Sequence, residues 1–263
     1  MLESIKQIVI EAGELIRHVH TTPDDISSKE GRANYVTRYD VMVQDYLFSR
    51  LSALLPEAIM VGEENSSNQT IGEGYAFIVD PIDGTSNFIA GFHYSCISVA
   101  LALNGQIILG VVYNPFNQEM FWAKRGCGSW KKAAYSNEIT RLHVVDRPIC
   151  EGLVCAATAH SYPEITDRYF LLARKILEKG TDIRRFGSGA LEICHIADRR
   201  SVLFFELLLA PWDYAAAWLI LEEAGGVITT VDGDAPNLNC KHSLAAGTPT
   251  AHAEFLQIAR DTR

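Results

Sequence analysis

The stretch Phe77-Ile-Val-Asp-Pro-Ile-Asp-Gly-Thr-Ser-Asn-Phe88 joins an apolar run to two aspartates, a proline and a glycine. The apolar run predicts a buried strand. Pro81 has no N–H and disfavours helix at Asp80, so both carboxylates are expected to leave a strand end and not one helical face. Two interpretations of this ending are open: a solvated turn, since Asp, Pro and Gly are ordinary turn residues, or a metal site.

The metal interpretation follows from the kinds of oxygen that the stretch presents. The carboxylates of Asp80 and Asp83 and the backbone carbonyl of Ile82 are hard donors, which suit Mg²⁺ better than zinc. Gly84 and Thr85 are expected to open a helix, and the free N–H groups of a helix N-terminus suit a phosphate. The pattern indicates a magnesium and phosphate site, with the plain turn as its alternative.

Acidic residues elsewhere in the chain are candidates to complete such a site. Glu63 and Glu64 close the short apolar segment 58–61, so one can turn inward while the other meets solvent; the alternative is a solvated loop. Asp213 falls in the first turn of a predicted helix, where the helix dipole alone would favour an acid. The alanine run 215–217 in that helix lets another element approach closely, which places Asp213 at a packed junction.

Composition limits the classes of protein to which this sequence can belong. With 263 residues, 48% of them hydrophobic, the chain can bury a large core in one domain or in two halves that share an interface. A net charge of −9 and a pI near 5.4 argue against a nucleic-acid binder or a binder of anionic membranes. The N-terminus does not read as a signal peptide, and no apolar run approaches the roughly 20 residues of a membrane span, so we expect a soluble, cytoplasmic protein. The six cysteines form no CxxC pair and are expected to be reduced thiols without a catalytic role.

Hydrophobic periodicity divides the chain into two α/β halves, residues 1–145 and 146–263, which we expect to pack as one compact unit. Asn104-Gly105 between two apolar runs indicates a hairpin, and the polar segment 21–32 is expected to form a mobile loop or flap. The predicted helices span residues 2–20, 40–55, 169–177, 190–196 and 212–224, and the predicted strands span residues 76–79, 97–103, 107–112, 119–123, 153–156, 183–186, 202–205 and 227–231.

Four blocks of sequence, in this order, resemble the inositol monophosphatase family of Mg²⁺-dependent, lithium-sensitive phosphomonoesterases. The resemblance spans nearly the whole chain, and its second and third blocks are the most specific. The blocks are Val36-Thr-Arg-Tyr-Asp40, Gly62-Glu-Glu64, Asp80-Pro-Ile-Asp-Gly-Thr85, and Trp212-Asp-x-Ala-Ala216 with Glu223-Ala-Gly-Gly226; a softer block is Arg185-Phe-Gly-Ser-Gly-Ala-Leu191.

The resemblance implies a metal-dependent mechanism. One Mg²⁺ would be held by Glu63, Asp80 and the Ile82 carbonyl, and a second by Asp80, Asp83 and Asp213; Glu63 would help to place a weaker third ion through water. A metal-activated water would be the nucleophile, and Glu63 and a Thr85–Asp40 pair would orient and deprotonate it. Mn²⁺ is expected to substitute for Mg²⁺, and Li⁺ to inhibit.

The resemblance also implies how the substrate is held. The N–H groups of Gly84 and Thr85 would bind the phosphate, and Glu206 would contact the alcohol. Lys29 matches a lysine in the family's flap near the metals; its alternative is a solvated loop lysine. The implied substrate-binding set is Asp83, Gly84, Thr85, Gly187, Ser188, Gly189 and Glu206.

The fold implied by the resemblance is of the α/β (α+β) class, a layered α-β-α-β-α sandwich that forms a homodimer. Its substrate would be a small phosphate monoester, myo-inositol monophosphate or a similar sugar or polyol phosphate, with no nucleic-acid or membrane partner. Alternatives are phosphatases of the same superfamily that act on fructose 1,6-bisphosphate, histidinol phosphate or phosphoadenosine phosphate, or a regulatory or scaffolding protein that retains the fold. The sequence departs from the family pattern at Asn34, at Ala90 and at residues 197–203; the last departure lies near Glu206 and leaves substrate choice open.

Overall fold

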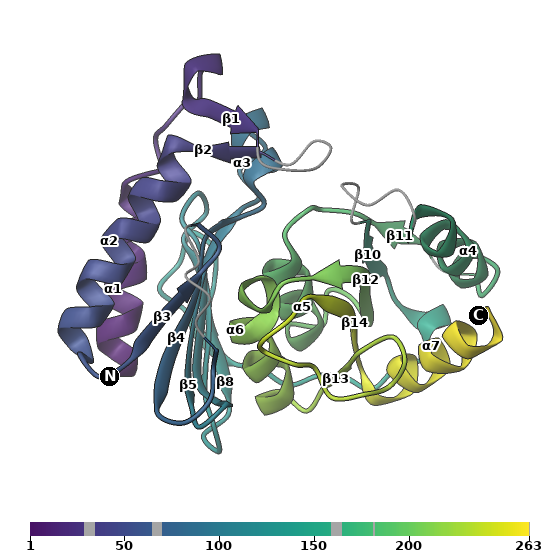
Figure 1. The fold of residues 1–263 in the computed structure, drawn as a ribbon. Coiled ribbons are helices and arrows are strands. Elements are labelled where there is room, and N and C mark those ends of the chain that lie inside the picture. Colours follow the sequence, from purple (N-terminus) through teal and green to yellow (C-terminus); the bar gives the residue numbers. More distant parts are fainter. Residues whose placement is uncertain (29–34, 65–69, 159–164, 181, 263) are drawn as a thin grey trace.

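A computed structural model describes residues 1–28, 35–64, 70–158, 165–180 and 182–262. Its helices and strands form five layers, helix–sheet–helix–sheet–helix, as Figure 1 shows. The layered α-β-α-β-α sandwich expected from the family resemblance is therefore confirmed. None of the helices in the described part of the chain is long and apolar enough to cross a membrane.

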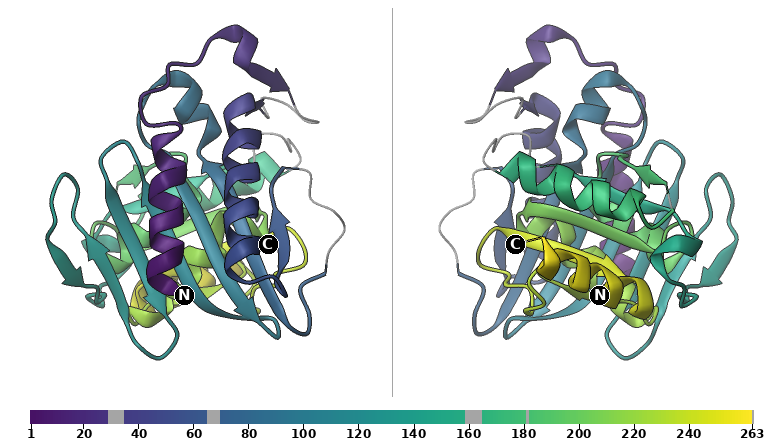
Figure 2. Two further views of the ribbon diagram at one scale, coloured as in Figure 1. Left: turned by 90° about the vertical axis from the view of Figure 1, so that its left-hand side faces the viewer. Right: turned by 90° about the vertical axis from the view of Figure 1, so that its right-hand side faces the viewer.

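The first layer consists of two helices that lie side by side across one face of the larger sheet (Figures 1 and 2). Helix α1 (Leu2–Glu14) buries Ile5, Val9 and Ala12, which recur at helical spacing. Helix α2 (Arg38–Leu54) begins at a capping box, in which Thr37 and Asp40 satisfy each other's backbone N–H groups. Helix α1 ends earlier than the predicted residue 20, because the chain turns at residues 15–18.

The second layer is a sheet of seven strands in the described residues, in the order β3-β4-β5-β6-β7-β8-β9. Strand β3 is parallel to β4, and the other neighbours are antiparallel. The predicted hairpin at Asn104-Gly105 is confirmed, since both residues have positive φ between β5 and β6. The strands are β3 (Ile59–Gly62), β4 (Tyr75–Asp83), β5 (Cys96–Leu103), β6 (Gln106–Asn114), β7 (Glu119–Lys124), β8 (Ser129–Lys132) and β9 (Ile139–Arg141).

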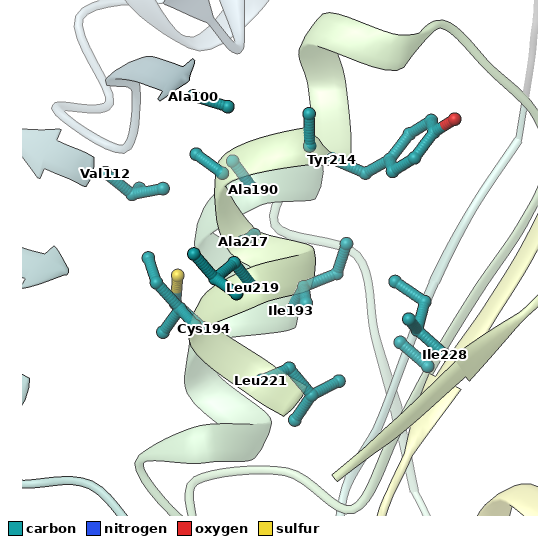
Figure 3. Packing of buried hydrophobic residues seen from close by; sticks show 14 of the residues in the cluster. Ala100, Val112, Ala190, Ile193, Cys194, Tyr214, Ala217, Leu219, Leu221 and Ile228 are labelled. Atoms are coloured by element: carbon teal, nitrogen blue, oxygen red, sulfur yellow. The ribbon is translucent and has the colours of Figure 1, made fainter. Parts of the chain in front are cut away.

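The middle layer, helices α5 (Gly189–Ala197) and α6 (Pro211–Glu223), is the core of the molecule. Figure 3 shows α5 and α6 between Val112 of the larger sheet and Ile228 of the smaller one. The alanine run 215–217 is buried, and a Cβ added to Gly110 on β6 would lie 2.5 Å from the Ala216 carbonyl oxygen. The close approach predicted for this alanine run is therefore confirmed.

The fourth and fifth layers complete the second half of the chain. The smaller sheet has the order β11-β10-β12-β14-β13, and helices α4 (Thr166–Leu177) and α7 (Pro249–Asp261) cover its outer face (Figure 2). Strand β14 and helix α7 follow the last predicted element and were not predicted. The strands are β10 (Val154–Ala157), β11 (Ile183–Arg184), β12 (Leu203–Leu209), β13 (Val227–Thr229) and β14 (His242–Gly247).

The segment expected to be a flap is more regular than predicted where it is described. A short 3₁₀ turn, Pro23–Asp25, leads into strand β1 (Ile26–Ser28), which pairs with β2 (Tyr35–Thr37). Lys29 and Asn34 lie outside the described residues. The larger sheet ends at residue 141 and β10 begins at residue 154, so the proposed division at 145 falls between the two sheets and stays a prediction.

Candidate metal centre and its cavity

One cavity of about 590 Å³ gathers nearly all of the predicted site residues that the structure describes. They reach it from both halves: the ends of β3 and β4 and the start of α3 (Thr85–Ala90) in the first half, and α5, β12 and α6 in the second. Asp40 does not line the cavity but lies directly behind it. The predicted residues on the wall are Glu63, Asp80, Ile82, Asp83, Gly84, Thr85, Gly187, Ser188, Gly189, Glu206 and Asp213.

A bulge at the end of β4 brings Asp80 and Asp83 into the same cavity. Asp80 pairs with Ser98 and Asp83 with Cys96, so β4 advances by three residues while β5 advances by two. In a regular strand, residues three apart point to opposite faces of the sheet. The extra residue of the bulge cancels this alternation, and both carboxylates therefore reach the cavity.

One carboxylate oxygen of each aspartate at the cavity accepts a hydrogen bond from another group of the protein. Asp80 Oδ1 accepts a hydrogen bond from the Ile82 N–H at 3.0 Å, and Asp213 Oδ2 accepts one from the Ala210 N–H at 2.8 Å. Asp83 Oδ2 accepts hydrogen bonds from the Ser188 hydroxyl at 2.6 Å and the Ala190 N–H at 2.8 Å. These bonds fix the three carboxylates before any ion binds.

Electrostatic repulsion among these acids is strong. Burial, followed by the charges of Glu63, Asp83 and Asp213, raises the pKa of Asp80 well above its usual range. The pKa of Asp213 is also raised, by burial and then by Glu63 and Asp83. Burial raises the pKa of Asp83 to about 6, although the hydrogen bond from Ser188 opposes that change. A bound cation would relieve this repulsion.

The donor set of the cavity fits Mg²⁺ in its chemistry. It consists of carboxylates and a carbonyl, which are hard oxygen ligands, and the cavity's described lining residues contribute one cationic side chain, Arg185. Among the described residues, however, no three His, Cys, Asp or Glu side chains already converge closely enough to hold a metal ion. The acids therefore surround the cavity without forming a finished chelate, as expected of repelling carboxylates that bond to the chain instead.

A buried hydroxyl–carboxylate pair lies behind the cavity. Asp40 is fully buried, and its Oδ2 accepts hydrogen bonds from the Thr37 N–H at 2.7 Å and the Thr37 hydroxyl at 2.6 Å. The Thr85 Oγ1 lies 3.2 Å from both Asp40 Oδ1 and the Ile82 carbonyl oxygen. One hydroxyl hydrogen serves one acceptor at a time, so donation to Asp40 leaves the Ile82 carbonyl free as a ligand.

The predicted turn glycine brings the two halves together. Gly84 has φ of +92°, and a Cβ at this position would lie 2.9 Å from the Gly187 carbonyl oxygen. Glycine is therefore required both by the backbone conformation and by the contact. Across the cavity, Glu206 on β12 is half-buried, and its pKa is raised well above the usual range by burial and then by Asp213.

Three residues at the mouth of the cavity were not predicted from the sequence. The Asn87 amide, the Glu192 carboxyl and the Arg185 guanidinium lie on or beneath the wall formed by residues 185–189. Arg185 and Asn87 stand inside quoted stretches, and Glu192 immediately follows one. Their positions relative to the cavity depend on contacts between the two halves, which no local pattern reports.

Comparison of the sequence and the fold with those of known proteins identifies related chains. The sequence profile described as the inositol monophosphatase family matches residues 1–263. An inositol-1-monophosphatase of Mesorhizobium japonicum is 30% identical over 89% of this chain and 85% of its own. The Nus factor SuhB of Escherichia coli is 28% identical over 99% of this chain and 96% of its own. A solved structure of an IMPase from Thermotoga maritima matches with a TM-score of 0.82 and 27% identity, over 99% of this chain and 96% of that one.

Proposed function

This chain belongs to the inositol monophosphatase family, and from that premise we propose that it is a Mg²⁺-dependent phosphomonoesterase acting on myo-inositol monophosphate or a similar small sugar or polyol phosphate. The observation that carries the proposal is the convergence of Glu63, Asp80, Asp83 and Asp213 on one cavity. Four acids with so little cationic compensation suit a function that brings cations to them. The proposed metal ligands are these four side chains and the Ile82 carbonyl.

Bound Mg²⁺ would supply the positive charge that offsets a phosphate dianion and makes water a better nucleophile at neutral pH. The chain's own residues would supply the proton path. With its hydrogen donated to Asp40, the Thr85 oxygen presents its lone pairs toward the cavity and can accept a hydrogen bond from the attacking water. Glu63 is the second candidate acceptor, since it lines the same cavity.

The remaining walls would hold the two ends of the ester. The backbone N–H groups of Gly84 and Thr85 are the proposed phosphate donors, at the start of α3. Glu206, with Gly187, Ser188 and Gly189, forms the proposed wall for the alcohol. A carboxyl group there can exchange hydrogen bonds with substrate hydroxyls, which suits a polyol better than an apolar alcohol.

Further parts of the proposal rest on the family resemblance alone. They are replacement of Mg²⁺ by Mn²⁺, inhibition by Li⁺ and assembly as a homodimer. The other sugar, histidinol and nucleotide phosphates of the superfamily remain alternative substrates.

A scaffolding role is the alternative from a different class. Relatives of similar identity carry two kinds of name, Inositol-1-monophosphatase and Nus factor SuhB. The presence of all four candidate metal carboxylates favours hydrolysis. The net charge of −9 does not favour direct contact with nucleic acid. We therefore place catalysis first.

A panel of phosphate esters, assayed across Mg²⁺ and Li⁺ concentrations, tests the proposal. The wild-type protein should hydrolyse a polyol monophosphate only with Mg²⁺, and the Asp80→Asn variant should lose that activity. Mg²⁺ should also raise the melting temperature of the wild type but not of Asp80→Asn, because an ion stabilises the state that binds it. Asp45→Asn, the same change on the exposed face of α2, is the matched control.

Two results would contradict the proposal. Near-normal turnover by Asp80→Asn would refute the metal assignment. Absence of Mg²⁺-dependent hydrolysis of every ester by the wild type, together with stable capture of a macromolecular partner, would favour the scaffolding alternative.

A further inference from the structure

Residues 186–189, here called the rim segment, form one stretch of the cavity wall that the second half contributes. The segment has little regular structure of its own: β11 ends at Arg184 and α5 begins at Gly189. Phe186 is 39% exposed and Gly187 has φ of +86°. Its shape must therefore come from side chains that bond to its backbone.

Asn87 bonds to the rim segment from the first half of the molecule. Its Nδ2 donates to the Phe186 carbonyl oxygen at 2.6 Å and to the Tyr94 carbonyl oxygen at 2.8 Å. The same amide lies 3.2 Å from where a Cβ of Gly187 would stand, so glycine admits it. Asn87 thus connects α3 to the rim segment across the boundary between the two halves.

Glu192 bonds to the rim segment from below. Its Oε1 accepts hydrogen bonds from the Phe186 N–H at 2.5 Å and the Gly187 N–H at 3.1 Å. The side chain is fully buried near the start of α5, and its Oε2 makes no hydrogen bond to any described residue. Burial of a carboxyl group costs free energy unless its oxygens accept hydrogen bonds. The two N–H bonds to Oε1 are the hydrogen bonds that offset this cost, so we expect them to be important for the shape of the rim segment.

The far end of the rim segment is fixed at the proposed metal centre. Ser188 Oγ and the Ala190 N–H both donate to Asp83 Oδ2. Asn87 and Glu192 hold the near end through the opposite edges of one residue, since Phe186 gives its carbonyl to Asn87 and its N–H to Glu192. The segment is therefore held from three directions by residues of two halves.

We propose that Asn87 and Glu192 are positioning residues that hold the rim segment in the shape that binds the alcohol part of the ester. Neither residue is a catalytic group in this proposal, because each acts through the backbone of residues 186 and 187. The expected effect on KM rests on the proposed function. The expected effect on the backbone of residues 186 and 187 rests on the hydrogen bonds alone.

Glutamine should replace Glu192 in this role, and leucine should not. The amide oxygen that Glu192→Gln introduces can accept both N–H groups, whereas Glu192→Leu keeps the volume and removes the acceptor. Burial raises the pKa of Glu192 to about 7, although the hydrogen bonds from the Phe186 and Gly187 N–H groups oppose that rise. Near neutral pH the native side chain is therefore partly protonated, and the neutral amide of Glu192→Gln resembles its protonated form.

The test compares four variants with the wild type: Glu192→Leu, Glu192→Gln, Asn87→Ala and Ile176→Ala. Ile176 is buried in α4, and its truncation loosens the second half away from the rim segment. Glu192→Leu and Asn87→Ala should each raise KM for the hydrolysed ester about tenfold, with kcat changed by less than about threefold. Glu192→Gln and Ile176→Ala should stay within about threefold of the wild type in both constants.

Amide hydrogen exchange supplies a readout that needs no activity. Exchange of the Phe186 and Gly187 N–H groups should accelerate about tenfold in Glu192→Leu and remain at the wild-type level in Glu192→Gln, relative to the global change in each variant. If exchange changes as expected but the wild type hydrolyses no ester, the positioning holds and the proposed function fails.

The inference is overturned if Glu192→Leu leaves both exchange and KM at the wild-type level. It is equally overturned if Ile176→Ala reproduces the rise in KM, because general loosening would then explain it. A double variant of Asn87→Ala with Glu192→Leu should raise KM by less than the product of the single effects, since both residues hold the same backbone.

Discussion

His195 is a base that the fold holds in one neutral form. The side chain is 7% exposed, with Nδ1 3.2 Å from the Tyr94 hydroxyl and Nε2 3.1 Å from Arg200. A guanidinium can only donate, so Nε2 must accept and Nδ1 carries the hydrogen that is donated to Tyr94. Burial, followed by the charges of Arg200 and Lys131, lowers the pKa of His195 to about 3.

This lowered pKa predicts a loss of stability in weak acid. The pKa of His195 is depressed from 6.5 on folding, so below pH 6.5 the unfolded chain binds a proton that the folded chain refuses. Between pH 7.5 and 5.5, His195 should therefore lower the free energy of unfolding by about 1.4 kcal/mol. The wild type should lose that much more than His195→Asn, as measured by urea unfolding at both pH values.

Taking the difference between the two proteins removes the contribution of the buried acids, whose raised pKa values act in the opposite direction. A wild-type-minus-variant difference that does not change with pH would contradict the prediction, because folded His195 would then bind a proton as readily as the unfolded chain does. At this scale the sequence identified the acids well, because each stands at the end of a predicted element. It did not identify Asn87, whose partner Phe186 is 99 residues away, or Glu192, whose partners Phe186 and Gly187 lie in a segment with little regular structure.

Close packing of α6 on β6 helps to position Asp213. The second residue of the alanine run lies against Gly110, which leaves no room for a methyl group. The sequence indicated that α6 could be approached closely but not by which strand. A small residue on any of several strands could accept the alanine run, so which strand packs on α6 is decided only when the layers assemble.

Substitution of Gly110 by alanine should strain this contact. The added Cβ would lie 2.5 Å from the Ala216 carbonyl oxygen and 3.1 Å from its Cα, both backbone atoms that cannot rotate away. Overpacking of this kind costs about 1–3 kcal/mol, so we expect Gly110→Ala to lower the free energy of unfolding by that amount. Chemical denaturation measures it.

Gly72→Ala is the matched control, because a Cβ there would meet no atom within 4 Å. An equal loss in the two variants would contradict the packing explanation, because Gly72 has room for the methyl group. We also expect Gly110→Ala to weaken hydrolysis, since displacement of α6 displaces Asp213.

At the scale of the whole molecule, the two halves share one core. The largest cluster of buried apolar residues joins Ala100 and Val112 of the larger sheet to Ile193 and Leu219 of the middle helices (Figure 3). The halves are also joined by the hydrogen bonds between Asp83 and the start of α5. Neither half can expose its side of this core to water without losing much of its stabilisation.

We therefore expect the two halves to unfold together. Differential scanning calorimetry should show one transition with a ratio of van 't Hoff to calorimetric enthalpy of about 1. A fragment of residues 1–145 should not reach a folded state alone, because the middle layer would be absent. Two resolved transitions, or a folded fragment, would show that each half is an independent domain.

The sequence by itself determined the family, the layered fold class and the acids that end β3 and β4 and begin α6. The acids follow from local rules, since periodicity sets the element and the residue after it points to the element's end. The family and the layered fold follow from the resemblance carried by the four sequence blocks. It did not predict the last strand and helix, β14 and α7, although α7 buries Ala251, Phe255 and Ile258 at helical spacing.

Only the tertiary structure decided which of these residues share a cavity. The bulge in β4 turns Asp80 and Asp83 to one side, and Gly84 admits the backbone of Gly187. Asn87 bonds to the rim segment across the halves, and Glu192 bonds to it from the start of α5. The contacts of Gly84 and Asn87 depend on the approach of chain segments about a hundred residues apart, such as Asn87 and Phe186 at a separation of 99. That approach is fixed by burial of the common core, which sums over the whole chain and leaves no signature in any single stretch of it.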